Sequence, residues 1–157
     1  MKLLFWSIGK AHDSYVSEGI GMFTKRITNY FPVEWQLLPP AKLPATASPK
    51  AYKDKEGQQV LDALKPGDYL VLLDEKGRML SSETFAAFIQ ARANDSTKQV
   101  VFLIGGAFGV SEDVKKRADF TWKLSDLVFP HQLVRLILSE QVYRGCSILR
   151  GEKYHHI

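Results

Sequence analysis

The chain has 157 residues, of which 45% are hydrophobic, and its 21 lysines and arginines against 17 aspartates and glutamates give a net charge of +4. This length suits one domain around one core, so we expect a single domain over residues 1–157 and no separate substrate domain. The mildly basic balance is compatible with a nucleic-acid partner but does not demonstrate one.

Cysteine content and apolar runs narrow the class of protein further. The one cysteine excludes an intrachain disulfide framework and a multi-cysteine metal site, and it suits a reducing compartment. No stretch reaches the roughly 20 consecutive apolar residues that a membrane-spanning helix needs. The apolar run 3–8 is too short for a secretory signal. We therefore expect a soluble, cytoplasmic protein with no membrane partner.

Strand and helix patterns alternate along the first half of the chain. The apolar run 3–8 predicts a strand, and apolar residues at three- and four-residue spacing over 16–27 predict an amphipathic helix. A second strand is expected at 33–38. Four prolines then fall within 39–49, which predicts an ordered loop or a mobile lid. A further helix is expected over 50–64, before Pro-Gly.

The second half continues the alternation. The expected strands lie at 69–73, 100–104 and 120–124, and the expected helices follow Ser81 or Ser82 up to 94–96, Ser111 up to Ala118, and Pro130 up to Leu149. The late strands lack polar alternation, as strands do when helices cover both of their faces. The sequence therefore predicts an α/β fold with a mostly parallel sheet flanked by helices.

The longest predicted helix, 130–149, is apolar around most of its circumference. Its apolar residues are Leu133, Val134, Leu136, Ile137, Leu138, Val142 and Tyr143. One covered face does not account for this distribution. Either the helix is central in the fold, or one side packs on the sheet and another on a second copy of the chain. We favour a homodimer.

Ligands of open parallel sheets bind beyond the carboxyl ends of the strands. The segments to search therefore follow Ile8, Leu73, Ile104 and Leu124. After Ile104 stands Gly-Gly-Ala-Phe-Gly at 105–109, where missing side chains let a ligand approach the backbone. A tight turn between a strand and a helix explains the same glycines.

Nucleotide-binding fingerprints fit this glycine run poorly. A dinucleotide fingerprint has glycines at its first, third and sixth positions, whereas these fall at the first, second and fifth, although Asp126 stands near the spacing of a ribose-binding acid. No Gly-Lys-Ser/Thr sequence follows, which excludes a P-loop. The apolar loop 125–131 can offer backbone groups to a flat heterocycle, and a buried connector is the alternative.

The C-terminal part gathers charge and rings. Its members are Arg135, Arg144, Arg150, Lys153, Glu140, Glu152, His131, His155 and His156. This is the best candidate for contact with a phosphate backbone, and Tyr154 beside His155 adds rings that stack on unpaired bases. The alternatives are a solvated tail and an ordinary pair of Glu140 with Arg144. Cys146 is expected in the core, and metal catalysis is not supported.

Five motifs stand in order along the chain: Leu-Leu-Asp-Glu-Lys-Gly at 72–77, Phe-Leu-Ile-Gly-Gly-Ala-Phe-Gly at 102–109, Leu-Ser-Asp-Leu-Val-Phe-Pro-His-Gln-Leu-Val-Arg at 124–135, Glu-Gln-Val-Tyr-Arg at 140–144, and Tyr154 with His155. On these motifs the chain resembles the RlmH family, bacterial methyltransferases that modify N3 of a pseudouridine in 23S ribosomal RNA. The resemblance implies a SPOUT-type α/β fold with a deep C-terminal trefoil knot, a homodimer, S-adenosylmethionine as cofactor, the assembled ribosome as partner, and no metal.

The resemblance also implies roles for individual residues. The cofactor would contact Leu73, Gly105, Leu124, Ser125, Asp126, Leu127, Val128 and Phe129. The RNA would contact His131, Arg144, Tyr154 and His155, with the tail of one subunit serving the pocket of the other. The catalytic residues would be Glu140, Arg144 and His155: Glu140 or His155 accepts or relays the N3 proton, and Arg144 pairs with phosphate or with charge on the imide oxygen.

Three other functions stay open at this point. A knotted RNA methyltransferase that acts on a different nucleotide would carry the same cofactor loops. A ribosome-binding module without catalysis would show damaged cofactor loops, and none is visible. A nicotinamide oxidoreductase is supported only by the strand, glycine and helix pattern. The identity of the general base and the purpose of the 39–49 loop also stay open.

Overall fold

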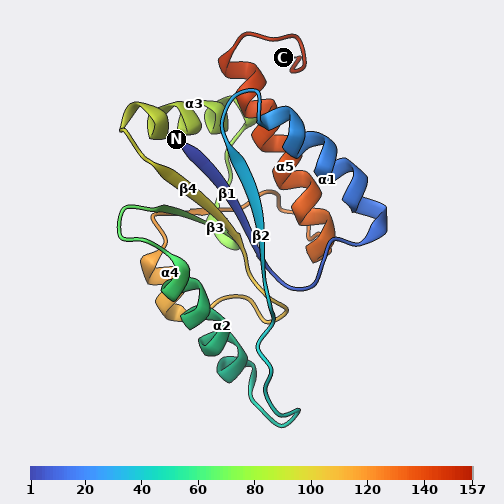
Figure 1. Ribbon diagram of the computed structural model, residues 1–157, viewed down its shortest axis with the longest axis vertical. Coiled ribbons are helices and arrows are strands. Elements are labelled where there is room, and N and C mark those ends of the chain that lie inside the picture. Colours follow the sequence, from blue (N-terminus) through green and yellow to red (C-terminus); the bar gives the residue numbers. More distant parts are fainter. Residues whose placement is uncertain (157) are drawn as a thin grey trace.

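The computed structural model describes residues 1–156, in which one parallel sheet lies between two helical layers (Figure 1). The strands are β1 Lys2–Ile8, β2 Val33–Leu38, β3 Tyr69–Arg78, β4 Gln99–Ile104 and β5 Phe120–Trp122. The helices are α1 Ser14–Ile27, α2 Pro49–Ala63, α3 Ser82–Asn94, α4 Glu112–Arg117 and α5 His131–Leu149. The strand order is β2-β1-β4-β3-β5 and each neighbouring pair is parallel, so the expected α/β architecture is confirmed. The order of the strands does not test the C-terminal trefoil knot, which stays a prediction.

Strand β5 ends at Trp122, two residues before the predicted end, and the largest departure from the prediction is in β3. Strand β3 continues past Leu73 to Arg78, with a register shift opposite β5 between these two residues. The Asp74 carboxylate accepts a hydrogen bond from the Lys76 N–H at 2.8 Å, which holds the irregular stretch in a local turn. Gly77 then lies against β5, where a Cβ would stand 2.5 Å from the Thr121 carbonyl oxygen. The residues at this bulge are polar and break the apolar pattern, so the pattern did not predict that the strand continues.

Alternate residues of the strands feed two separate cores. Phe5 and Phe102 face the layer of α1, α3 and α5, where Phe85 stacks on Trp122 with ring centroids 4.2 Å apart. Trp6 belongs to the other core, which covers the face packed by α2 and α4. Both faces of the sheet are therefore apolar, which is why its strands are continuously hydrophobic. Truncating one of these buried aromatic side chains to alanine costs about 3–5 kcal/mol.

Helix α5 lies between α1 and α3 and shares their face of the sheet (Figure 1). Two glycines bring it close to its neighbours. A Cβ on Gly19 of α1 would stand 2.8 Å from Leu136 Cδ1, and a Cβ on Gly145 would stand 3.1 Å from Ile89 Cδ1 of α3. This central position is one of the two explanations offered for the apolar circumference of α5. A homodimer stays a prediction.

Candidate functional site

A cavity of about 830 Å³ lies beyond the carboxyl ends of β3, β4 and β5. The eight residues expected to contact a cofactor all line it: Leu73, Gly105, Leu124, Ser125, Asp126, Leu127, Val128 and Phe129. They come from three segments that are distant in sequence, which meet because parallel strands end at the same edge of the sheet. We call this space the larger cavity. The role of these residues toward a cofactor stays a prediction.

The glycine segment forms one wall of the larger cavity as a tight turn. The Gly109 N–H donates to the Gly106 carbonyl at 3.0 Å, and Gly109 has a φ of +87°, which favours glycine. A Cβ on Gly105 would stand 2.8 Å from Val110 Cγ1. The run 105–109 is thus both the compact turn and the backbone-lined wall that the sequence suggested. Its hydrogen-bonding groups belong largely to the main chain.

The loop that follows β5 is exposed at its tip, so the alternative of a buried connector is wrong. Leu127 is 71% exposed and Val128 is 90% exposed. The Leu127 N–H donates to Ser125 Oγ at 2.9 Å, and Lys123 pairs with Asp126 at 2.5 Å, so the loop is held locally. Adjacent exposed apolar side chains at the mouth of a cavity are typical of a surface that receives a ligand or a partner.

His131, at the first position of α5, lies between the strand ends. Its Nε2 donates to the Gly105 carbonyl oxygen at 2.5 Å, because a carbonyl can only accept. Burial lowers the pKa of His131, and the nearby Arg135 guanidinium lowers that pKa further. The ring is therefore a neutral Nε2–H donor that ties α5 to the glycine turn. Among the four residues expected to contact RNA, only His131 lines the larger cavity.

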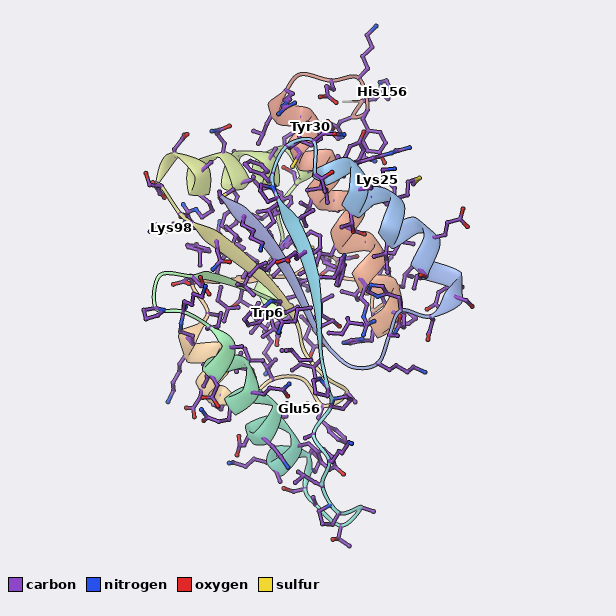
Figure 2. The ribbon with its side chains drawn as sticks, in the orientation of Figure 1. Trp6, Lys25, Tyr30, Glu56, Lys98 and His156 are labelled. Atoms are coloured by element: carbon purple, nitrogen blue, oxygen red, sulfur yellow. The ribbon has the colours of Figure 1, made fainter. Side chains whose placement is uncertain are left out.

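A smaller cavity of about 380 Å³ adjoins the larger one and shares Gly106, Ala107, Phe108 and His131 with it. It lies between the end of β1, residues 40–41 and α2. Its walls include Glu56 of α2, which is 5% exposed and faces the segment after β2 (Figure 2). Sequence reasoning missed Glu56, because it stands in the charged stretch of α2 and nothing local marks it as buried.

The proline-rich segment is anchored to α2. Glu56 Oε2 accepts a hydrogen bond from the Ala41 N–H at 2.9 Å, and the Tyr52 hydroxyl donates to the Leu43 carbonyl at 3.2 Å. The Tyr52 ring also lies 5.5 Å from the Phe108 ring, which belongs to the glycine segment. Of the two expectations, the structure therefore shows the ordered loop, and it forms one side of the smaller cavity.

The charged residues near the C-terminus form a network, which we call the C-terminal cluster: Glu83, Glu140, Arg144, Tyr154 and His155. Arg144 Nη2 donates to Glu140 Oε1 at 2.7 Å, and the Tyr154 hydroxyl donates to the same oxygen at 2.9 Å. His155 lies 3.0 Å from Arg144 through Nδ1 and 2.8 Å from Glu83 through Nε2. The Arg144 guanidinium lies 4.7 Å from the Tyr154 ring centroid. The segment is therefore neither a freely solvated tail nor a simple helix pair.

The C-terminal cluster lies at the opposite end of α5 from the two cavities. Arg144 stands thirteen positions after His131 in α5, which at a rise of about 1.5 Å per position is about 20 Å. The structure thus does not bring Glu140, Arg144 and His155 to the larger cavity of the same chain. Glu140 already accepts bonds from Arg144 and Tyr154, so its carboxylate is not a free proton acceptor here.

Other chemistries find little support in residues 1–156. Cys146 is 1% exposed in the core, as predicted, and burial raises the pKa of its thiol to about 12. Such a thiol is not a nucleophile at neutral pH. No group of three or more metal-ligating side chains converges within the described residues. No helix among them has both the length and the apolar character to cross a bilayer.

Comparison with known proteins gives consistent matches along nearly the whole chain. Residues 1–155 match the family described as "Predicted SPOUT methyltransferase". A relative from Cytophaga hutchinsonii is 44% identical over 156 residues, covering 99% of this chain and 100% of its own. Relatives from Parabacteroides distasonis and Alkaliphilus oremlandii are each 42% identical, and each match covers 99% of both chains. All three are named "Ribosomal RNA large subunit methyltransferase H".

Proposed function

The chain belongs to the SPOUT methyltransferase family, and from that premise we propose that it transfers a methyl group from S-adenosylmethionine to N3 of a pseudouridine in 23S ribosomal RNA. The observation that carries the proposal is the convergence of three loops on the larger cavity. The names of relatives at 42–44% identity supply the class of substrate, a ribosomal RNA of the large subunit. The proposal includes the deep trefoil knot that the resemblance implies.

The walls of the larger cavity fit S-adenosylmethionine. The cavity volume of about 830 Å³ lies within the range of small-molecule sites. Leu73, Leu124 and Phe129 provide apolar contact for a flat adenine, and the backbone of the 105–109 turn provides hydrogen-bonding groups. When bound, the cofactor would supply a methyl group carried on a sulfonium. A ring nitrogen would bond to that methyl carbon in line with the S–C bond, and the thioether sulfur would leave. The task of the chain is to hold nucleophile and methyl group in that line and to help the imide proton leave.

The RNA-facing side chains come from a second copy in this proposal. Within one chain Arg144 stands about 20 Å along α5 from His131, and a homodimer removes this separation. The partner's Arg144 would pair with a phosphate or with charge on the imide oxygen, and the partner's Tyr154 and His155 would stack on the base. Leu127 and Val128, exposed at the mouth of the larger cavity, give the second copy an apolar surface to contact.

The substrate in this proposal is the assembled ribosome, which places the enzyme in the cytoplasm. A net charge of +4 is modest for a protein that grips free RNA. Recognition by the shape of the folded ribosomal surface demands less charge than recognition of an isolated strand. The proposal therefore expects much weaker methyl transfer to free 23S RNA than to ribosomes.

The test is methyl transfer from labelled S-adenosylmethionine to ribosomes that lack the modification, beside free ribosomal RNA, with the product nucleotide mapped by mass spectrometry. The proposal expects label on N3 of a pseudouridine, in ribosomes and not in free RNA. Label on another nucleotide would support methyl transfer to ribosomal RNA and would contradict the pseudouridine as the target. Cofactor binding without transfer to either acceptor would instead support a catalytically silent ribosome-binding module.

A further inference from the structure

We infer that the smaller cavity receives the target uracil ring and that Glu56 accepts its N3 proton. This inference rests on the proposed function and names the part of the chain that meets the base. The sequence left the general base open between Glu140 and His155. Both of these residues are engaged in the C-terminal cluster, whereas Glu56 stands in a cavity that adjoins the larger one.

The position of the smaller cavity suits a methyl acceptor. It shares Gly106, Ala107, Phe108 and His131 with the larger cavity, so a group in one lies beside a group in the other. Gly106 carries no side chain of its own, and Glu56 Oε1 lies 2.6 Å from the point where its Cβ would stand. In this arrangement N3 of a ring in the smaller cavity meets the methyl group of a cofactor in the larger cavity at the edge where the two cavities adjoin, because in-line transfer requires the two atoms about 3–3.5 Å apart with nothing between them.

The walls of the smaller cavity suit a flat, half-polar ring. Ile8, Pro40 and Phe108 offer apolar and aromatic surface, and the polar side chains of the lining are those of Lys10, Tyr52, Glu56, His131 and Gln132. This combination of apolar walls with a small number of placed polar groups is typical of sites for small heterocycles. Phe108 is 50% exposed and its ring packs at a tilt on the Tyr52 ring, so the exposed part of the ring is available to an incoming base.

Glu56 is a buried carboxylate with unused hydrogen-bonding capacity. Its Oε2 accepts one hydrogen bond, from the Ala41 N–H, and no cation in residues 1–156 forms an ion pair with it. Buried carboxylates are normally paired or fully hydrogen-bonded. Its Oε1 lies 2.6 Å from the point where a Cβ on Gly106 would stand, on the wall that both cavities share. The N3–H of a uracil ring is the donor that this oxygen lacks.

Arg135 supplies a positive charge behind the same cavity. This side chain is fully buried, donates to Ser7 Oγ at 3.0 Å and to the Lys10 carbonyl at 2.9 Å, and leaves its Nη2 without a partner in the described chain. Nη2 lies 3.0 Å from the point where a Cβ on Gly9 would stand, and Gly9 lines the smaller cavity. Negative charge that develops on the ring as N3 loses its proton is stabilised by this cation.

The step balances in atoms and charge. The N3–H bond breaks and its proton goes to the Glu56 carboxylate, while the electron pair of that bond forms the new N3–CH₃ bond. The electron pair of the breaking S–CH₃ bond stays on sulfur, which changes from a sulfonium to a thioether. One negative and one positive charge are consumed together. Lys10, Tyr52 and His131 are the other titratable groups lining the cavity, with Arg135 behind Gly9.

Glu56→Gln tests the inference, because the amide oxygen still accepts from the Ala41 N–H while the proton acceptor is lost. We expect cofactor binding within twofold of wild type by calorimetry. We expect turnover on unmodified ribosomes at pH 7 to fall by about 100-fold or more. The loss should shrink about tenfold per pH unit as the medium is made more alkaline, because N3 then ionises without help. Asp54→Asn, an exposed change on the same helix, serves as the control and should leave turnover unchanged.

A second variant guards against a folding defect. Glu56→Asp keeps the charge but withdraws the carboxylate by one methylene, so we expect a smaller loss of turnover with the pH profile of wild type. Wild-type turnover and pH profile in Glu56→Gln would overturn the inference and leave the proposed function intact. Weakened cofactor binding in that variant would also overturn it, because the smaller cavity would then hold part of the cofactor. Failure of wild type to methylate ribosomes would remove both.

Discussion

The two ends of helix α5 are built from different chemistry. Its first residue, His131, stands among glycines, main-chain groups and apolar walls beside the two cavities. Its last turns carry Glu140 and Arg144, which join Tyr154, His155 and Glu83 in a network of charges and rings. A cofactor gripped by backbone leaves no motif of charged residues, whereas contact with phosphate and bases requires charge and aromatic surface.

In the proposed function, each chain therefore carries two separate halves of a site. Helix α5 is packed between α1 and α3 and acts as a rigid spacer, so local movement does not close the distance of about 20 Å. Two copies related by a twofold axis would each supply the half that the other lacks.

The largest effect is expected from Gly105→Val, which adds a side chain to the wall of the larger cavity. The Cβ of the new side chain would stand 2.8 Å from Val110 Cγ1, and its two methyl groups would crowd the turn further. We expect cofactor affinity to fall by at least about 100-fold, equivalent to about 2.7 kcal/mol, and turnover to be lost. Calorimetry with S-adenosylmethionine measures this. Gly21→Ala on the open surface of α1 is the matched control, and tight cofactor binding by Gly105→Val would refute the assignment of the larger cavity.

Arg144→Gln should separate the two halves cleanly. It removes the guanidinium that lies over Tyr154 and bonds Glu140, and it leaves the larger cavity untouched. We expect turnover on ribosomes to fall by about 100-fold, with cofactor affinity unchanged. Lys98→Gln makes the same change of charge at an exposed position before β4 and should cost less than threefold. Loss of cofactor binding in Arg144→Gln would contradict the division into two halves.

Acidification should lower the free energy of unfolding, through His131 and His12 near the two cavities. Burial and the Arg135 charge lower the pKa values of His131 and His12 below 6.5 in the folded chain. Each ring binds fewer protons folded than unfolded, so its contribution is complete above pH 6.5 and declines as pH falls below that value. Denaturant unfolding at pH 7.5 and 5.5 should show lower stability at pH 5.5, with a smaller decline in His131→Gln. Equal declines in both proteins would refute a neutral His131.

The smallest effect is expected from Tyr154→Phe. The ring remains for Arg144 and Tyr143 to pack on, and only the hydroxyl that donates to Glu140 is lost. The expected cost is about 1 kcal/mol, a few-fold loss in turnover, since the remaining Arg144 bonds still hold Glu140. Steady-state assays on ribosomes would measure it. Tyr154→Ala should cost clearly more, and equal losses in the two variants would mean that the ring itself contributes nothing.

Much of the fold follows from the sequence because helices and strands differ in hydrophobic period. Strand β2 and the start of α5 fall where the pattern predicts them. The cavity loops were found by the rule that ligands bind at strand ends, and the resemblance named their residues. The extension of β3 to Arg78 was missed because a bulge breaks the period. Glu56 was missed because a burial that depends on contact with Ala41 has no local signature.

Mixing two inactive variants in one dimer is the decisive test of a site built by two copies of the chain. Gly105→Val lacks a working larger cavity and Arg144→Gln lacks the RNA-facing cation, so each homodimer has no complete site. Co-expression with two different tags allows the mixed dimer to be isolated, in which one cavity from the Arg144→Gln copy meets an intact Arg144 of the partner copy. If two chains build each site, the mixed dimer should methylate ribosomes at about half the wild-type rate, because one of its two sites is whole. A mixed dimer as inactive as its parents would contradict a site shared between two copies.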